Sequence, residues 1–114
     1  MDSTSQVELP ESFLAIYLRP GQTKPKVGWE EVYARYELCE DLACMLQETA
    51  KTMQNDLFLS EQVVLERCHA GLRGPDAVTR PKEAAWIVRR LAELIEWDSS
   101  TVLQLLDQWE IAAE

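Results

Sequence analysis

The sequence has little of what most catalytic and phosphate-binding sites require. It contains one histidine, three cysteines and four glycines in 114 residues. Neither a G-x-x-x-x-G-K-[ST] loop nor a G-x-G-x-x-G turn occurs, which excludes nucleotide hydrolysis by the usual phosphate-binding loop. No apolar run approaches the roughly 18–20 residues that a membrane-spanning helix needs. We therefore expect a protein with no cofactor and no membrane segment.

Basic residues are also scarce. Eleven lysines and arginines stand against 20 aspartates and glutamates, which gives a net charge of −9. Because nucleic-acid phosphates attract positive side chains, this balance argues against direct nucleic-acid binding. Residues 1–6 lack the basic and apolar regions of a signal peptide, and three cysteines are an odd number for a disulfide-bonded secreted domain. These features predict a cytoplasmic protein.

Helical periodicity dominates what the sequence does contain. Apolar residues make up 46% of the chain, enough for a packed core. Residues 1–8 are predicted to be a disordered lead, and residues 9–114 a single helical domain. Pro10 suits the first turn of a short helix over residues 11–18, although the dense apolar residues there also suit a strand. The loop at residues 19–28 carries three bases and no acid.

A long helix is predicted from residue 29 to about residue 55. Its apolar residues recur at alternating spacings of three and four, the period of one helix face. Their mixed sizes favour packing inside the protein's own bundle, with a homodimer seam as the alternative, because two-stranded coiled coils prefer Ile, Val and Leu. Tyr33, Leu42 and Met45 are expected to widen this face. The stripe consists of Trp29, Val32, Tyr36, Cys39, Ala43, Leu46, Ala50 and Met53.

Shorter helices are predicted after the long one. Ser60 is placed to cap a helix that ends near Leu72, and Thr79 to cap the next, which has Pro81 in its first turn. Residues 98–100 supply a cap for a last helix. With short links between them, these segments predict an all-α fold, a compact bundle of four or five helices.

Charge is segregated along these helices. Residues 30–48 carry six acids and one base, residues 67–90 carry six bases and two acids, and residues 91–114 carry six acids and no base. Solvated faces explain most such runs, but an acidic face can also dock and steer a basic partner. A half-exposed tryptophan beside the basic residues would serve as an anchor. The candidate partner-binding residues are Glu30, Glu37, Glu40, Asp41, Arg89, Arg90, Asp107 and Glu110.

Cys68 and His69 are adjacent in the sequence. A catalytic dyad needs its thiol and imidazole within hydrogen-bond reach, whereas neighbouring helix positions point roughly 100° apart. The pattern favours a packed Cys68 and a His69 at the polar edge of its helix. The alternative is a small cysteine-dependent enzyme, or a redox or metal sensor, that uses Cys39, Cys68 and His69. Zinc is disfavoured because Cys39 and Cys44 are five residues apart on one helix.

The last two helices can be drawn as a helix-turn-helix over residues 81–97 and 101–112. The helix that would enter the groove carries Asp107 and Glu110 and no base, and phosphates repel such a helix. DNA binding is therefore not expected. An acidic DNA mimic that inhibits a DNA-binding protein is a second alternative.

Four segments carry a resemblance to a known family: VELPxSF at residues 7–13, ARYELCED at 34–41, VLERCHxGL at 64–72 and WIVxRLAEL at 86–94, where x is an unspecified position. Together they resemble a family of small uncharacterised bacterial proteins, sometimes labelled as an ATPase with chaperone activity. The resemblance covers about residues 7–97 and implies no catalytic residue. Because the sequence has no Walker motif, it implies at most association with an ATPase.

These observations predict a non-catalytic cytoplasmic adaptor or regulatory protein, not an enzyme. It would bind another protein through its acidic helical faces. The expected partner has a basic surface or is an ATPase, and no metal is expected.

Overall fold

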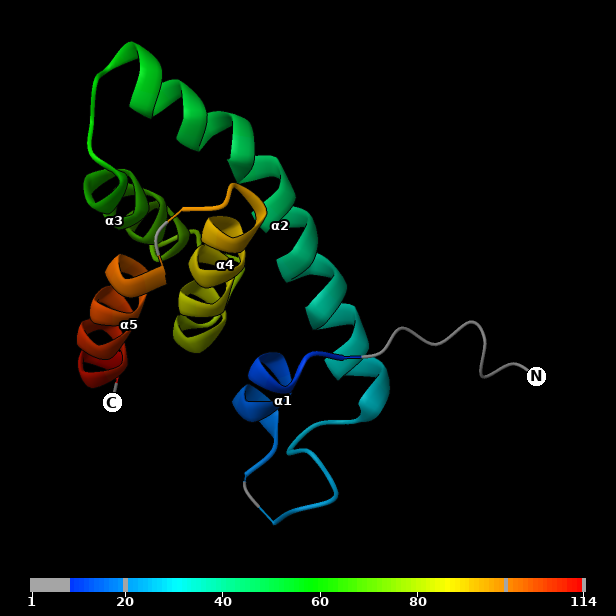
Figure 1. Ribbon diagram of the computed structural model, residues 1–114. Coiled ribbons are helices and arrows are strands. Elements are labelled where there is room, and N and C mark those ends of the chain that lie inside the picture. Colours follow the sequence, from blue (N-terminus) through cyan, green and yellow to red (C-terminus); the bar gives the residue numbers. More distant parts are fainter. Residues whose placement is uncertain (1–8, 20, 98, 114) are drawn as a thin grey trace. The chain divides into compact units, whose positions relative to one another are not determined.

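The computed structural model describes residues 9–19, 21–97 and 99–113; the side chains of residues 99, 101, 103 and 110–113 lie outside the description. The predicted disordered lead at residues 1–8 and the capping residue Asp98 also lie outside it. Within the described ranges the chain forms five helices and no strand, which confirms the all-α fold class. The helices are α1 (Glu11–Tyr17), α2 (Trp29–Asp56), α3 (Glu61–Leu72), α4 (Pro81–Leu94) and α5 (Ser99–Ala113) (Figure 1).

The chain divides into two compact units, Met1–Leu38 and Cys39–Glu114. In the first unit, α1 buries Phe13 and Tyr17. The Phe13 ring meets Tyr36 of α2 edge-on, with 5.4 Å between ring centroids. The loop after α1 is tied back by the Lys26 N–H, which donates to the Tyr17 carbonyl at 3.2 Å. The segment that also suited a strand is therefore a helix, held by aromatic packing.

The second unit has its own core, to which α3, α4, α5 and the C-terminal part of α2 contribute. Buried residues at helical spacing on each element supply it, and half-buried residues such as Leu46 and Met53 pack around it. Burial of such side chains is the main source of stability, at about 1.5–3 kcal/mol for each large one. The buried set is Ala50, Val64, Leu65, Cys68, Val88, Leu91, Ala92, Val102 and Leu105.

The predicted stripe on α2 faces inward along nearly its whole length. Every member except Trp29 is buried or half-buried, while Met45, expected to widen the face, is 70% exposed. Met45 lies about 100° from Leu46, so its side chain points past the edge of the buried face. The prediction for Met45 is therefore wrong.

The helix ends follow local chemistry. Ser60 caps α3 as predicted, and its hydroxyl accepts from the Val63 N–H at 3.3 Å. The cap of α4 is Arg80 rather than Thr79. The fully buried Glu83 accepts from the Arg80 N–H at 3.0 Å, which satisfies that donor from within the helix. Thr79 instead donates its hydroxyl hydrogen to the Leu72 carbonyl at 3.3 Å, joining the link to the end of α3.

α4 ends in a Schellman turn with a residue other than glycine in the left-handed position. Glu96 has φ of 58°, and its N–H donates to the Glu93 carbonyl at 3.3 Å. The Trp97 N–H donates to the Ala92 carbonyl at 2.9 Å, and Trp97 packs against the core. These two bonds define the motif. The chain is thereby turned sharply toward α5.

Candidate functional site

The exposed side of α2 carries the first group of predicted partner-binding residues. Glu30, Glu37 and Asp41 are all exposed. Spacings of seven and four place them on one side of the helix, opposite the buried stripe. Glu48, seven residues after Asp41, is also exposed and continues the series. We call these four residues together with Met45 the outer face of α2.

Met45 supplies an apolar side chain to this outer face. It follows Asp41 by four residues and precedes Glu48 by three, so it lies beside both on the helix surface. Methionine is flexible and polarisable, and it is enriched in protein interfaces. The outer face therefore combines a carboxylate row with an adaptable apolar contact. The sequence signal for the carboxylates was their spacing; Met45 was missed because it neighbours an inward residue.

Glu40 does not belong to the outer face, because it is engaged within the second unit. Arg90 of α4 forms a bidentate contact with the Glu40 carboxylate: Nε lies 2.9 Å from Oε1, and Nη2 lies 3.0 Å from Oε2. The Arg90 Nη1 also donates to Glu93 Oε1 at 3.2 Å. The hydrogen bond to Glu40, opposed by burial and helped by Glu93, raises the pKa of Arg90. The geometry assigns Glu40 and Arg90 a packing contact between α2 and α4.

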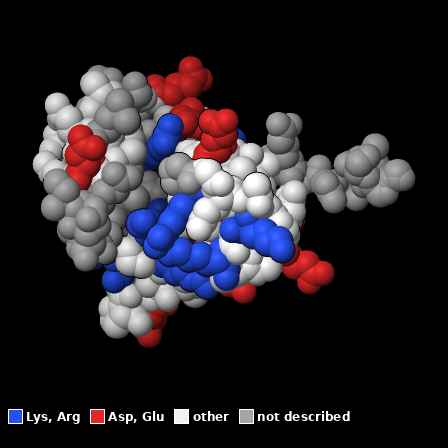
Figure 2. Space-filling model, turned by 90° about the horizontal axis from the view of Figure 1, so that it is seen from below, with Lys and Arg blue, Asp and Glu red and all other residues white. Residues whose placement is uncertain are grey.

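The remaining charged candidates are spread over the surface. Arg89 is exposed and its Nε lies 4.0 Å from Glu93 Oε2, a weak surface pair. Asp107 is exposed on α5, and the side chain of Glu110 lies outside the described part of the chain. Exposed lysine and arginine side chains are visible in blue in Figure 2. The structure thus brings Glu40 and Arg90 together.

The cysteines are packed as small core residues, with one exception. Cys39 and Cys68 are buried, and Cys44 is exposed. Burial raises the pKa of the Cys68 thiol, which disfavours the thiolate that nucleophilic and metal-binding chemistry needs. No group of three or more His, Cys, Asp or Glu side chains suited to a metal ion occurs among the residues that the structure describes.

His69 occupies a different place from the one predicted. Instead of lying at the polar edge of α3 it is 5% exposed, and its ring stacks on Trp109 of α5. The ring centroids are 3.7 Å apart and the planes 9° apart. Burial first, and the charge of Arg73 second, lower the pKa of His69 to about 4. The prediction that His69 lies at the polar edge of α3 is wrong because the ring that covers it, Trp109, belongs to α5. The sequence of α3 alone does not indicate how α5 packs against it.

The four tryptophans range from buried to exposed, and Trp97 and Trp109 are half-buried. Trp86, the tryptophan nearest to Arg89 and Arg90 in the sequence, is buried and offers no anchor. Trp29 is 42% exposed, and its ring lies 6.4 Å from that of Tyr33. Sequence analysis missed a more exposed apolar pair, Leu57 and Phe58, which link α2 to α3. The Asp–Leu–Phe–Leu–Ser run contains no breaker residue, so no pattern marked it as a surface turn.

Comparisons with known protein families, with curated proteins and with solved structures gave no match. The resemblance to small bacterial proteins, and the association with an ATPase that it implies, therefore remain predictions from the sequence. Among the residues that the structure describes, no helix has the length and apolar character needed to cross a membrane.

Proposed function

We propose that this protein is a non-catalytic adaptor or regulatory protein that binds a basic protein partner through the outer face of α2. The observation that carries the proposal is the 70% exposure of Met45 between the exposed Asp41 and Glu48. An apolar side chain among carboxylates suits a partner that presents an apolar groove with Lys or Arg at its rim. The carboxylates would steer the approach, and Met45 would be buried on docking.

Two further observations favour binding over cysteine chemistry. Cys39 and Cys68 are buried, and the Cys68 pKa is raised. The imidazole of His69 lies flat against Trp109. A thiol in an apolar setting is a poor nucleophile at neutral pH, and a stacked ring has one face already covered.

The proposal is tested with variants that keep the buried side of α2 unchanged. In the first, Glu37→Lys and Asp41→Lys are combined; in the second, Met45→Ser removes the apolar contact. The control combines Glu66→Lys with Asp76→Lys, two exposed carboxylates outside α2, and so carries the same change of net charge. Each protein is used to capture partners from its native cell extract at low and at high salt.

We expect one partner to be retained by the wild type and the control and lost from both α2 variants. Its binding should weaken as salt rises, because screening shortens the reach of the carboxylates. Equal capture by all four proteins would refute the proposal. Loss of cellular function in Cys68→Ala, with full function in the Glu37→Lys/Asp41→Lys variant, would favour the cysteine-dependent alternative instead.

A further inference from the structure

The link between α2 and α3 presents two apolar side chains to solvent. Leu57 is 56% exposed and Phe58 is 88% exposed, the largest exposure of any large apolar residue described. The link is an ordered turn: the N–H groups of Leu57 and Leu59 both donate to the Met53 carbonyl, at 3.2 and 3.5 Å. Leu59 in turn packs against the core. We call Leu57 and Phe58 the apolar tip.

Phe58 also adopts a backbone conformation that is unfavourable for a bulky residue. Its φ is 55°, in the left-handed region where glycine is the usual occupant. A phenylalanine there is strained and gains no burial in return. Strain kept at an exposed aromatic points to a use for that side chain outside the fold of the single chain.

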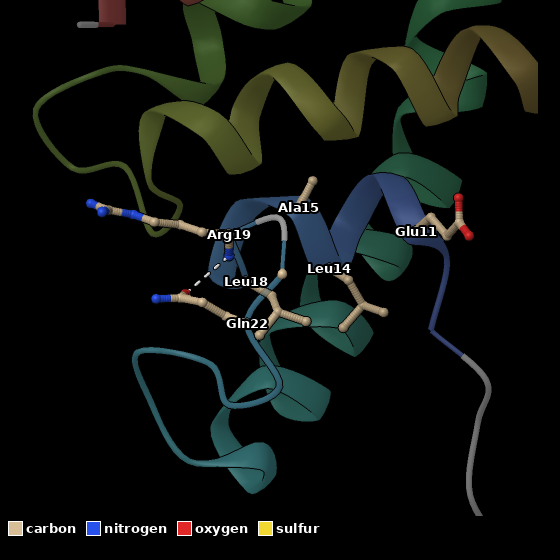
Figure 3. Close-up of a pocket in the computed structure, with 7 residues that line it drawn as sticks. Glu11, Leu14, Ala15, Leu18, Arg19 and Gln22 are labelled. Atoms are coloured by element: carbon tan, nitrogen blue, oxygen red, sulfur yellow. Dashed lines mark hydrogen bonds between the residues drawn. The ribbon is translucent and has the colours of Figure 1, made fainter.

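A shallow apolar pocket lies in the first unit, lined by residues of α1 and of the start of the loop that follows it (Figure 3). Leu14 and Leu18 extend from the same side of α1, and Ala15 lies between them in sequence. The volume of the pocket is about 330 Å³, near the lower end of the range for ligand pockets. The remaining lining residues are Glu11, Arg19, Gly21 and Gln22, and the Arg19 N–H donates to Gln22 Oε1 at 3.2 Å.

The charges around the two features are complementary. Asp56 precedes the apolar tip directly, and residues 52–66 contain acids and no base. The loop at residues 19–28 supplies part of the pocket lining, including Arg19. This loop contains Arg19, Lys24 and Lys26 and no acid, and all three bases are exposed. The segment around the apolar tip and the loop that lines part of the pocket thus carry charges of opposite sign. The acid Glu11 also lines the pocket.

We propose that the apolar tip of one copy of this chain docks in the α1 pocket of a second copy. Both halves of the contact are present on every chain, the pocket in the first unit and the apolar tip in the second. Burial of the Phe58 ring supplies the apolar contact, and Asp56 is drawn to the bases of the 19–28 loop. Because tip and pocket are different surfaces, each contact joins unlike surfaces of two chains, and the fraction of associated chains rises with concentration.

The first experiment measures self-association by sedimentation velocity over a range of concentrations. Phe58→Gly removes the ring and suits the positive φ, so the fold is kept. Ala15→Glu places a carboxylate at the pocket on an exposed helix position. The control, Ala70→Glu, makes the same change at an exposed position of α3. We expect the wild type and the control to associate alike and each of the two variants to bind roughly tenfold or more weakly.

The second experiment mixes the two defective variants. Phe58→Gly retains an intact pocket, and Ala15→Glu retains an intact tip, so an equimolar mixture should form a one-to-one complex that neither forms alone. Such a complex is expected only if tip and pocket bind each other. A wild type that sediments as a monomer at every concentration, association that survives in both variants, or a mixture that remains monomeric would each overturn the proposal.

Discussion

Lowering the pH should destabilise this protein through His69 in particular. In the folded chain, burial and the nearby Arg73 lower the pKa of His69 to about 4, from 6.5. A pKa lowered by folding means that the unfolded chain binds the proton more tightly, so stability is lost as pH falls from 6.5 toward 4. Between about pH 7.5 and pH 5 this one group should remove about 2 kcal/mol from the free energy of unfolding.

The matched variant is His69→Phe. A phenyl ring retains a flat surface for the stack on Trp109 but cannot bind a proton. Urea unfolding of both proteins at the two pH values gives four free energies, and carboxylate titration, which is common to both proteins, cancels in the comparison. We expect the wild type to lose about 2 kcal/mol more than the variant. Equal losses, or a smaller loss in the wild type, would refute the assignment of a buried neutral imidazole at this position.

Three further predictions follow from the backbone conformation of Glu96, the contact between Arg90 and Glu40, and the burial of the cysteines. Glu96→Gly should stabilise the protein by about 0.5–1 kcal/mol, because glycine adopts the positive φ without strain, whereas Glu96→Ala should give no such gain in the same urea assay. Arg90→Lys should cost about 1 kcal/mol of unfolding free energy, because an ammonium group cannot reproduce the two-pronged contact with Glu40, while Arg89→Lys should cost less than about 0.5 kcal/mol. Cys44 alone should react with a thiol reagent under native conditions, and the other two thiols should react only on unfolding; rapid labelling of all three would contradict their burial.

Periodicity predicted the helices well because each buried face repeats locally along the chain. The α2 stripe from Val32 to Met53 and the cap at Ser60 both depend on residues within four positions of one another. The cap of α4 was misplaced by one residue because the Thr79 side chain bonds to the end of the preceding helix instead. A side chain such as Thr79 can either cap the following helix or bond to the preceding one, and the local sequence does not indicate which of the two contacts forms.

The candidate site was less accessible to sequence analysis because it depends on contacts between helices. Nothing in α3 alone indicates that a tryptophan of α5 covers His69, and nothing in α2 alone indicates that Arg90 takes Glu40 out of the acidic row. Phe58 was missed for a different reason: its exposure depends on a positive φ at a residue that rarely adopts one. The exposed carboxylates at positions 37 and 41 were found because their spacing alone fixes their side of the helix.

The forked contact between Arg90 and Glu40 also constrains how the chain can vary. Replacement of either residue leaves the charge of the other half-buried and without its main hydrogen bonds. Any single substitution at this pair therefore lowers the free energy of unfolding. Tolerated changes should therefore come in pairs, with a neutral polar pair or two apolar residues replacing both charges at once. Position 89, one residue away and exposed, has no such restriction. In any set of related sequences, positions 40 and 90 should vary together, while position 89 varies freely.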